Sequence, residues 1–290
     1  MSTNTQEAAA TLNTKSLGNF GVEIIGFDFE RPVDAPMAQA LLDLADRELI
    51  LLFRGQQLSE STHVAFTEAL GIIIPPVEPA FASATEPRLL RLGNVAMDGS
   101  KLPDQSAAAS YGDGGEPWHS DGSFKSEPNY ITLLHALEIP PERGDTWYAS
   151  MVAAYENLSQ DMKDRLEGLE MTHPYASENK AADGWEGTKL GATVHPLVRT
   201  IPGGQKALFL AHAASDGKII GMDPTEGAAL LQQLFDHATQ EQFIYKHKWQ
   251  LHDLLIWNNR GVIHSARGWD RSKFRRLMQR SETLAPRVYA

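Results

Sequence analysis

The stretch Leu254-Leu255-Ile256-Trp257-Asn258 is a short apolar run bounded by polar residues, which predicts a buried β-strand. Segments of the same kind recur along the chain, at 22–27, 49–53, 131–137, 146–149, 197–200, 207–211, 243–249 and 275–283. Apolar residues at helical spacing occur in four segments, 35–47, 61–70, 160–169 and 224–238. Short strands joined by Gly and Pro turns, with few helices, predict a mainly β fold with flanking helices, built as a jelly-roll sandwich.

Capping residues mark the ends of three of the expected helices. Gly71 is well placed to end the second helix, and Ser159 to cap the start of the third. At the fourth helix Asp223 can act as the N-cap, Pro224 suits the first turn, and Glu226 can close a capping box.

Composition limits the kinds of function. The chain has 290 residues, 42% of them hydrophobic, and a net charge of −11. An acidic chain without a run of Lys and Arg argues against nucleic acid and against anionic membrane surfaces as partners. The sequence contains no cysteine, which excludes disulfides, thiolate metal sites, iron–sulfur clusters and a cysteine nucleophile. A metal would therefore have to bind His, Asp, Glu or backbone oxygens.

The domain organisation is simple. Residues 1–15 are polar and Ala-rich and are expected to form a mobile tail, followed by one domain over 16–290. The start lacks a signal-peptide core, and the longest apolar run, 49–53, is too short to span a bilayer, so a cytoplasmic protein is expected. Two stretches rich in Gly, Ser, Ala and Asp, 97–117 and 176–193, are expected to be long loops that act as lids or are disordered.

The sharpest chemical signal is Trp118-His119-Ser120-Asp121. In an extended strand residues i and i+2 point to one face, so an imidazole and a carboxylate would aim at one point. His264 is the best candidate for a third ligand. Two His and one carboxylate form the facial triad of non-haem Fe(II) oxygenases. The alternative is a hydrogen-bonded surface pair, because His-x-Asp is common by chance.

Two arginines accompany this constellation. At strand spacing Arg276, Met278 and Arg280 share one face. Buried guanidinium groups are costly unless anions pair with them, so the spacing suggests an interior site for two carboxylates. The alternative is a polar strand face on which both arginines are solvated.

Taken together, these residues resemble the taurine dioxygenase and 2,4-dichlorophenoxyacetate dioxygenase family of Fe(II)/2-oxoglutarate oxygenases. The resemblance runs from about Leu17 to about Leu284. The segments that carry it are 118–124 (WHSDGSF), 144–146 (GDT), 195–200 (HPLVRT), 247–253 (HKWQLHD) and 256–260 (IWNNR). The family fold is a double-stranded β-helix, a cupin-like jelly roll, which agrees with the expected strands.

The resemblance implies a role for each candidate residue. His119, Asp121 and His264 would hold Fe(II), with 2-oxoglutarate and O2 as co-substrates. The 2-oxoglutarate would bind through Thr146 and Arg276. Because Asp121 is present, where related halogenases have a small residue, hydroxylation is the expected outcome.

The resemblance also bears on the substrate. Arg280 would hold an anionic group on a small organic substrate. The motifs look closer to the phenoxyacetate branch, so a phenoxyalkanoate-like acid is expected, with alkylsulfonates or sulfate esters as the alternative. Taurine-specific members carry His and Tyr where this chain has Pro75 and Glu78, and Glu78 is expected to be exposed. Asn258 stands where many relatives have Asp.

Two rival readings come from other classes. A zinc-dependent hydrolase could use the same His, Asp and His ligands to activate water, but it leaves Thr146 and the two arginines unexplained. A cupin-like protein that only binds a metal or small acid predicts binding without turnover. Because family members are often dimers or tetramers, the resemblance also implies a homo-oligomer.

Overall fold

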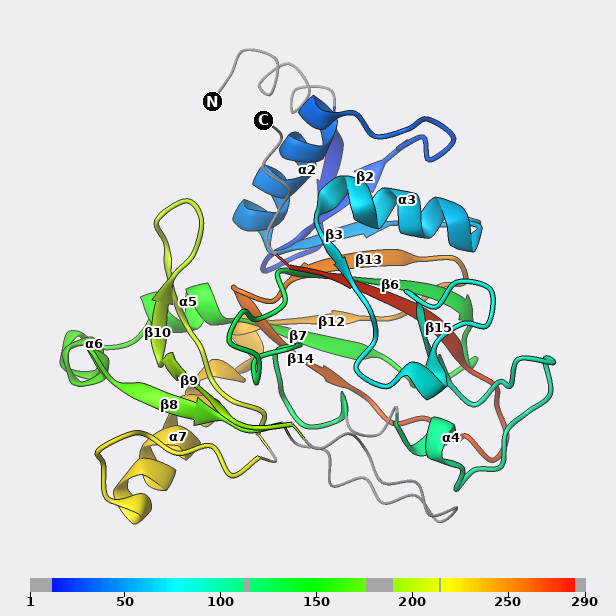
Figure 1. The fold of residues 1–290 in the computed structure, drawn as a ribbon. Helices are drawn as coiled ribbons and strands as arrows, with labels where there is room; N and C mark the ends of the chain where they lie inside the picture. Colours follow the sequence, from blue (N-terminus) through cyan, green and yellow to red (C-terminus); the bar gives the residue numbers. More distant parts are fainter. Residues whose placement is uncertain (1–11, 112–114, 176–189, 214, 285–290) are drawn as a thin grey trace.

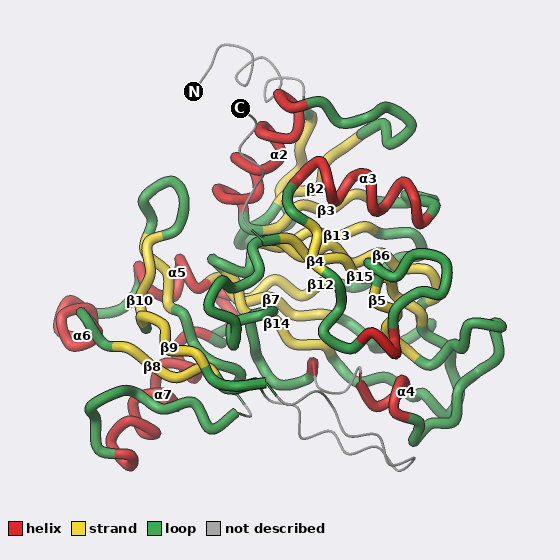
Figure 2. Tube along the Cα trace, in the orientation of Figure 1, coloured by secondary structure: helices red, strands yellow, loops and turns green. Residues whose placement is uncertain are grey.

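The computed structural model describes residues 12–111, 115–175, 190–213 and 215–284. Figure 1 shows a large twisted sheet with helices α2 and α3 on one side and a smaller sheet on the other. Figure 2 gives the same view by secondary structure, in which strands fill the centre and helices lie at the periphery.

The large sheet has eight strands among the described residues, in the order β1-β2-β3-β13-β6-β15-β4, with β5 also paired to β15. Their bounds are β1 Asn13–Ser16, β2 Val22–Ile25, β3 Ile50–Phe53, β4 Ile73–Ile74, β5 Leu90–Gly93, β6 Ile131–Glu138, β13 Leu254–Asn258 and β15 Leu277–Thr283. All pairs are antiparallel except β2 with β3. The central strands β3 and β13 are buried at every position, as strands covered on both faces must be.

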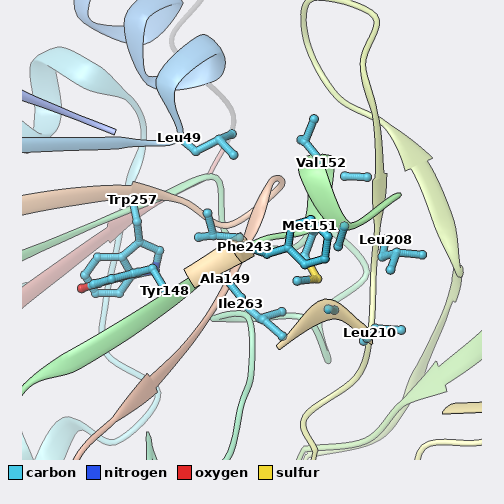
Figure 3. Packing of buried hydrophobic residues seen from close by; sticks show 14 of the residues in the cluster. Leu49, Tyr148, Ala149, Met151, Val152, Leu208, Leu210, Phe243, Trp257 and Ile263 are labelled. Carbon is cyan, nitrogen blue, oxygen red and sulfur yellow. The ribbon is translucent and has the colours of Figure 1, made fainter. Parts of the chain in front are cut away.

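The smaller sheet holds β12 Ile244–His247, β7 Thr146–Ser150 and β14 Val262–Ala266. It packs on the inner face of the large sheet around a core that includes Tyr148, Trp257 and Ile263, drawn in Figure 3. Two sheets closed on each other in this way form the predicted double-stranded β-helix. Two ribbons extend it, β8 Glu170–His173 with β9 Thr193–Pro196, and β10 Val198–Thr200 with β11 Lys206–Leu208.

Helices cover the outside of this sandwich. The helices α2 Ala35–Glu48 and α3 Glu60–Leu70 close a second hydrophobic cluster on the outer face of the large sheet. The other helices are α4 Ala107–Tyr111, α5 Met151–Glu156, α6 Gln160–Leu166 and α7 Pro224–Ala238, with short 3-10 turns η1 Pro79–Phe81 and η3 Glu241–Phe243. No helix within the described residues is long and apolar enough to cross a membrane.

The predicted N-caps and C-cap are confirmed, whereas the carboxylate of Glu226 pairs with Arg165 at 3.0 Å and is not seen to close the predicted capping box. The side chains of Ser159 and Asp223 accept backbone N–H groups at the starts of α6 and α7, and Gly71 is the C-cap of α3. Other expectations need correction. Residues 13–15 belong to β1 and not to a tail, while residues 1–11 lie outside the described part, as do 176–189 of the second expected loop. The first expected loop contains α4.

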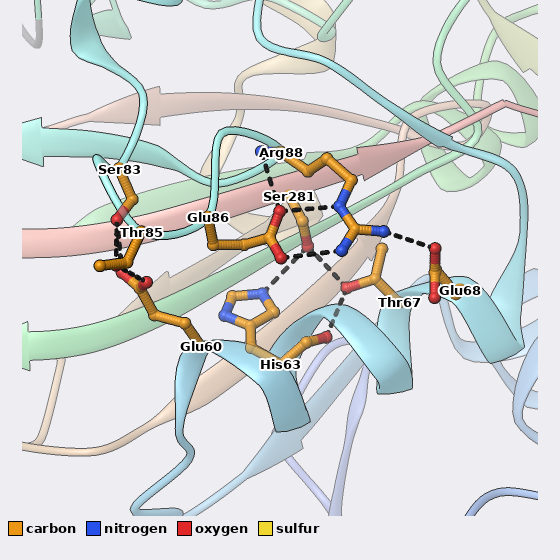
Figure 4. A network of polar contacts seen from close by, with 9 residues as sticks. All are labelled: Glu60, His63, Thr67, Glu68, Ser83, Thr85, Glu86, Arg88 and Ser281. Atoms are coloured by element: carbon orange, nitrogen blue, oxygen red, sulfur yellow. Dashed lines mark hydrogen bonds and ion pairs between the residues drawn. The ribbon is translucent and has the colours of Figure 1, made fainter.

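Strand β15 is fixed against α3 by polar contacts. The hydroxyl of Ser281 lies 3.0 Å from His63 Nε2 and 2.8 Å from Thr67 Oγ1, both on α3 (Figure 4). Because side chains alternate along a strand, anchoring Ser281 outward turns its neighbours Arg280 and Glu282 toward the interior of the sandwich. The same figure shows Arg88 bound by Glu86 and Glu68, which ties the loop before β5 to α3.

Candidate active site

Residues 119 and 264 are brought together by the backbone. They form an isolated antiparallel bridge, in which His119 N donates to His264 O at 3.0 Å and His264 N donates to His119 O at 2.7 Å. Their imidazole rings lie side by side with centroids 4.1 Å apart. Strand β14, which carries His264, therefore also places the segment that contains His119.

Asp121 completes the group. Its Oδ1 lies 3.8 Å from His119 Nε2 and its Oδ2 lies 3.8 Å from His264 Nε2. One donor atom from each of the three residues lies within 4.8 Å of the others. His119 Nδ1 is 2.8 Å from the carbonyl of Pro117, and donating there leaves Nε2 free to bind a metal. Two nitrogens and one carboxylate oxygen suit Fe(II) and leave positions open for ligands.

Burial and charge put these groups in the protonation state that a metal requires. Burial lowers the pKa of His119 to about 3 and that of His264 to about 4. Burial acts to raise the pKa of Asp121, but the Arg280 guanidinium, together with the two imidazoles in their protonated form, outweighs it and holds that pKa below its ordinary value. Near neutral pH the site thus offers two neutral imidazoles and one carboxylate without displacing protons.

A hydrogen-bond network orients Asp121. Thr132 Oγ1 donates to Asp121 Oδ2 at 2.8 Å, and Asn259 Nδ2 donates to Thr132 Oγ1 at 2.8 Å. Asn259 Oδ1 in turn accepts the backbone N–H of Asp121 at 3.1 Å and the indole N–H of Trp257 at 3.0 Å. Strands β6 and β13 pair so that Thr132 lies opposite Trp257, which brings these groups under the site.

Thr132→Val is expected to weaken Fe(II) binding about tenfold or more, because partners of metal ligands typically contribute 10- to 100-fold to metal affinity. The substitution keeps the side-chain shape while removing the donor to Asp121. The Fe(II) dependence of succinate release measures the effect. Thr200→Val, at an exposed strand end, is the control and should leave it unchanged. An unchanged Fe(II) requirement in Thr132→Val would show that this network does not orient the carboxylate.

The triad opens into a cavity of about 160 Å³. At about 10–15 Å³ for each water centre, that is space for roughly ten waters, enough for a small keto acid and a second small molecule. Apolar walls come from Val77, Leu92, Phe124 and Leu134. The polar side chains along it include Lys125, Thr146, Arg276, Arg280 and Glu282.

Arg276 is a buried cation that has no anionic partner in the described part of the chain. It is 8% exposed, and no carboxylate of the described residues lies within ion-pair distance of its guanidinium. Burial lowers its pKa to about 10, so it remains charged near neutral pH. Thr146 lines the same cavity, and its Oγ1 accepts the indole N–H of Trp249 at 3.0 Å. Because Thr146 Oγ1 accepts from Trp249, its hydroxyl proton is available to donate, either to Tyr148 beside it or to a ligand.

Arg280 differs, because it already has two partners. Its Nη1 lies 3.2 Å from Asp121 Oδ1 and its Nη2 lies 3.2 Å from Glu282 Oε1. Burial alone would lower the pKa of Arg280, but the carboxylates of Glu282 and Asp121 raise it above its ordinary value. An anionic ligand at Arg280 would therefore meet a guanidinium that is already partly neutralised.

Residues 13–281 match the model of the family described as taurine catabolism dioxygenase TauD, TfdA family. This chain belongs to the TauD/TfdA dioxygenase family. It is 34% identical over 279 residues to the alpha-ketoglutarate-dependent 2,4-dichlorophenoxyacetate dioxygenase of Cupriavidus pinatubonensis, covering 91% of this chain and 93% of that one. It is 32% identical over 153 residues to an alpha-ketoglutarate-dependent sulfonate dioxygenase of Saccharomyces cerevisiae, covering 51% and 37%.

A solved structure supports the same fold and family. AAD-2 in complex with Mn(II) and N-oxalylglycine superposes with a TM-score of 0.83 at 30% identity, covering 96% of this chain and 100% of that one. The predictions of the TauD/TfdA fold, of a dioxygenase, and of Fe(II) with 2-oxoglutarate are thus confirmed at the level of the family. These relatives give no support to the zinc hydrolase.

Two predictions about individual residues of this TauD/TfdA protein were wrong, and one residue that the sequence left unexplained has a structural role. Residues 119–121 were expected in a strand, but only His119 pairs, and the chain turns at Gly122 with a φ of 66°. Glu78, expected to be exposed, is 4% exposed, and its carboxylate acts electrostatically on Tyr111 and Tyr175 of the cavity wall. Asn258 now has an explanation: its amide donates to Asp46 at 2.7 Å, where an aspartate would place two carboxylates together.

Several cavity residues were missed. Glu282 continues the 276–278–280 spacing by one more step, so the alternation along β15 could have found it. Lys125 follows the metal motif without any distinguishing signal. No sequence pattern distinguishes His212, yet it lines the cavity with its ring centroid 5.2 Å from that of His119. Thr132 and Asn259 reach the site only through strand pairing, which no local pattern indicates.

Proposed function

We propose that this TauD/TfdA dioxygenase hydroxylates a small anionic organic acid of the phenoxyalkanoate type. The observation that carries the proposal is one cavity that holds both the triad and the buried Arg276, which has no anionic partner among the described residues. In this proposal His119, Asp121 and His264 hold Fe(II). The far carboxylate of 2-oxoglutarate pairs with Arg276 and accepts a hydrogen bond from Thr146.

The substrate class rests on the second half of the cavity. Arg280 offers a cation for an acid group, and the apolar side chains of Leu92, Phe124 and Leu134 suit an aromatic or alkyl body. The 2,4-dichlorophenoxyacetate dioxygenase, similar over nine-tenths of both chains, supports an aryloxy acid. Hydroxylation of a carbon that bears an ether oxygen gives a hemiacetal-type product, which falls apart, so the net reaction would be cleavage.

The second candidate is an alkylsulfonate or sulfate ester. A guanidinium binds a sulfonate as readily as a carboxylate, and the sulfonate dioxygenase among the relatives supports this choice. Taurine itself is a poor fit, because Pro75 stands where taurine-specific members of the resembled family carry a ligand side chain.

The mechanism assigns positioning and charge compensation to the protein. Iron with 2-oxoglutarate and O2 supplies the oxidation, which transfers one oxygen atom to the substrate and releases succinate and CO2. Arg276 and Thr146 fix the co-substrate by its far end, and Arg280 orients the substrate by its acid group. Asp121, held by Thr132, keeps its carboxylate turned toward the two imidazoles.

A screen for succinate release tests the proposal. With Fe(II), ascorbate and 2-oxoglutarate, phenoxyacetate should stimulate succinate formation, and phenol should accumulate in equal amount. Hexanesulfonate and hexyl sulfate test the second candidate. Turnover with the sulfur compounds alone would transfer the proposal to that class, and activity indifferent to oxygen and 2-oxoglutarate would refute it.

Two further expectations remain predictions. We propose a cytoplasmic location and a homo-oligomeric state, the latter on the resemblance to oligomeric family members. Size-exclusion chromatography with light scattering measures the second, and a strictly monomeric mass would contradict it.

A further inference from the structure

A row of charged and amide side chains lines the substrate half of the cavity. It runs from Lys125 through Asn129 and Glu282 to Arg280. Lys125 Nζ donates to Asn129 Oδ1 at 2.9 Å, the amide of Asn129 donates to Glu282, and Glu282 Oε1 lies 3.2 Å from Arg280 Nη2. None of these contacts belongs to the metal triad.

The row is built into the fold and is not a chance surface contact. Asn129 is 1% exposed and Glu282 is 6% exposed. A Cβ added at Gly122 would lie 2.3 Å from Asn129 Oδ1, so the turn after the metal motif packs directly on this amide. Glu282 is directed inward because its strand neighbour Ser281 is bound to α3 on the other face.

The part of the cavity around the triad and Arg276, where 2-oxoglutarate is proposed to bind, carries no net charge once the metal and co-substrate are bound. On the proposed function, Fe(II) and Arg276 contribute three positive charges, which Asp121 and the doubly charged 2-oxoglutarate cancel. The substrate half then holds two cations, Lys125 and Arg280, and one anion, Glu282. Burial raises the pKa of Glu282, and the Arg280 guanidinium and the Asn129 amide oppose that rise. Glu282 is counted as an anion because of its ion pair with Arg280, at 3.2 Å. One positive charge is left over among the side chains that line the cavity. Glu78 is buried behind this lining, where its charge acts on Tyr111 and Tyr175 of the cavity wall.

We propose that this row selects a substrate with a single negative charge, bound between Lys125 and Arg280, and that Glu282 excludes substrates with two. The inference rests on the proposed function and narrows its substrate class. Glu282 offsets part of the positive charge of Arg280 and repels a second negative charge on the substrate. Because like charges in a buried site repel each other strongly, this repulsion should strongly lower the affinity for doubly charged substrates. Because Arg280 is already paired with Asp121 and Glu282, Lys125 provides the additional positive charge that holds the anionic group of the substrate.

Binding of three matched probes tests the selection. They share a phenoxymethyl body and carry a carboxylate (phenoxyacetate), a phosphonate (phenoxymethylphosphonate) or an uncharged amide (phenoxyacetamide). At about pH 8 a phosphate-type group carries close to two charges. Calorimetry with the full chain, loaded with Mn(II) and 2-oxoglutarate without oxygen, gives each Kd. The wild type should bind phenoxyacetate about tenfold or more tightly than the phosphonate.

The variants change the charge of the row by single steps. Glu282→Gln should reduce or reverse the preference for phenoxyacetate. Lys125→Met should weaken phenoxyacetate about tenfold while leaving the amide within about twofold. Combining both should restore the preference for the singly charged probe, because the leftover charge returns to its original value. Restoration by a double variant distinguishes charge selection from a change in cavity shape.

Controls keep the test decisive. Glu241→Gln and Lys15→Met, both on the exposed surface, should leave all three affinities unchanged. Lys125→Arg should retain the wild-type preference, and together with Lys125→Met it decides the matter if Glu282→Gln does not fold. Identical carboxylate-to-phosphonate ratios in the wild type and in the Lys125 and Glu282 variants would overturn the inference.

The outcomes also separate this inference from the proposed function. If phenoxyacetate binds with the predicted charge dependence but releases no succinate with Fe(II) and oxygen, the substrate class fails and the charge selection stands. If phenoxyacetate is turned over but the variants do not alter the preference, only the selection fails. Failure of the wild type to bind either anion contradicts both, because Arg280 would then be closed to an acid group.

Discussion

His119→Ala is expected to abolish succinate release and to weaken Fe(II) binding by about 100-fold or more. The reason is that even side chains behind metal ligands contribute 10- to 100-fold to metal affinity, and this imidazole is proposed to bind the metal itself. The same result is expected for Asp121→Ala, which also leaves Arg280 with one carboxylate partner instead of two. Equilibrium dialysis against Fe(II) under argon measures the binding, and succinate release the turnover.

The matched control is His237→Ala on α7. This imidazole also bonds a backbone carbonyl, that of Ala154, but does not line the cavity. Its loss should change stability at most and leave Fe(II) affinity unaltered. Circular dichroism of His119→Ala should retain the wild-type spectrum, because the backbone bridge between residues 119 and 264 does not need the imidazole. A His119→Ala enzyme that still binds Fe(II) with wild-type affinity would refute the proposed triad.

The fold could be predicted where the signal is local. The central strand Leu254–Asn258 is apolar at four of its five positions, and the start of α7 is encoded by Asp223 and Pro224. Strand β1 could not be predicted, because its residues Asn13–Ser16 are polar and exposed and are held by backbone pairing with β2 alone. Helix α5 begins directly where β7 ends, at Ser150, so no turn residue announces it.

In the candidate site, too, local motifs could be predicted from the sequence, whereas contacts between distant segments could not. The His-x-Asp motif and the arginine spacing lie within seven residues each, so the sequence contains them whole. Whether a given arginine is free depends on contacts across the fold. Arg280 is paired with Asp121, 159 positions away, and Arg276 is not paired among the described residues. The sequence therefore predicted an arginine for each of two anions, 2-oxoglutarate and the substrate, and could not show that one guanidinium is shared with Asp121 while the other is unpaired among the described residues.

This difference leads to the second large effect, expected for Arg276→Ala. The variant should raise the 2-oxoglutarate concentration required for half-maximal turnover by about 10- to 150-fold, because a hydrogen bond to a charged group contributes about 1.5–3 kcal/mol. The kcat at saturating 2-oxoglutarate should fall much less, since Thr146 still holds the same carboxylate in the proposed complex. Steady-state succinate release at fixed Fe(II) and substrate gives both constants.

Arg275→Ala is a stringent control because it removes the same side chain one position earlier. Arg275 points outward, with 42% of its side chain exposed, and pairs with Glu138 on the surface. Its loss should leave the 2-oxoglutarate requirement within about twofold of wild type, as exposed ion pairs contribute little. Because the two variants carry the same charge change, long-range electrostatics would affect both alike. Equal shifts in Arg275→Ala and Arg276→Ala would therefore remove Arg276 from the co-substrate site, whereas a shift confined to Arg276→Ala places the carboxylate beside its guanidinium.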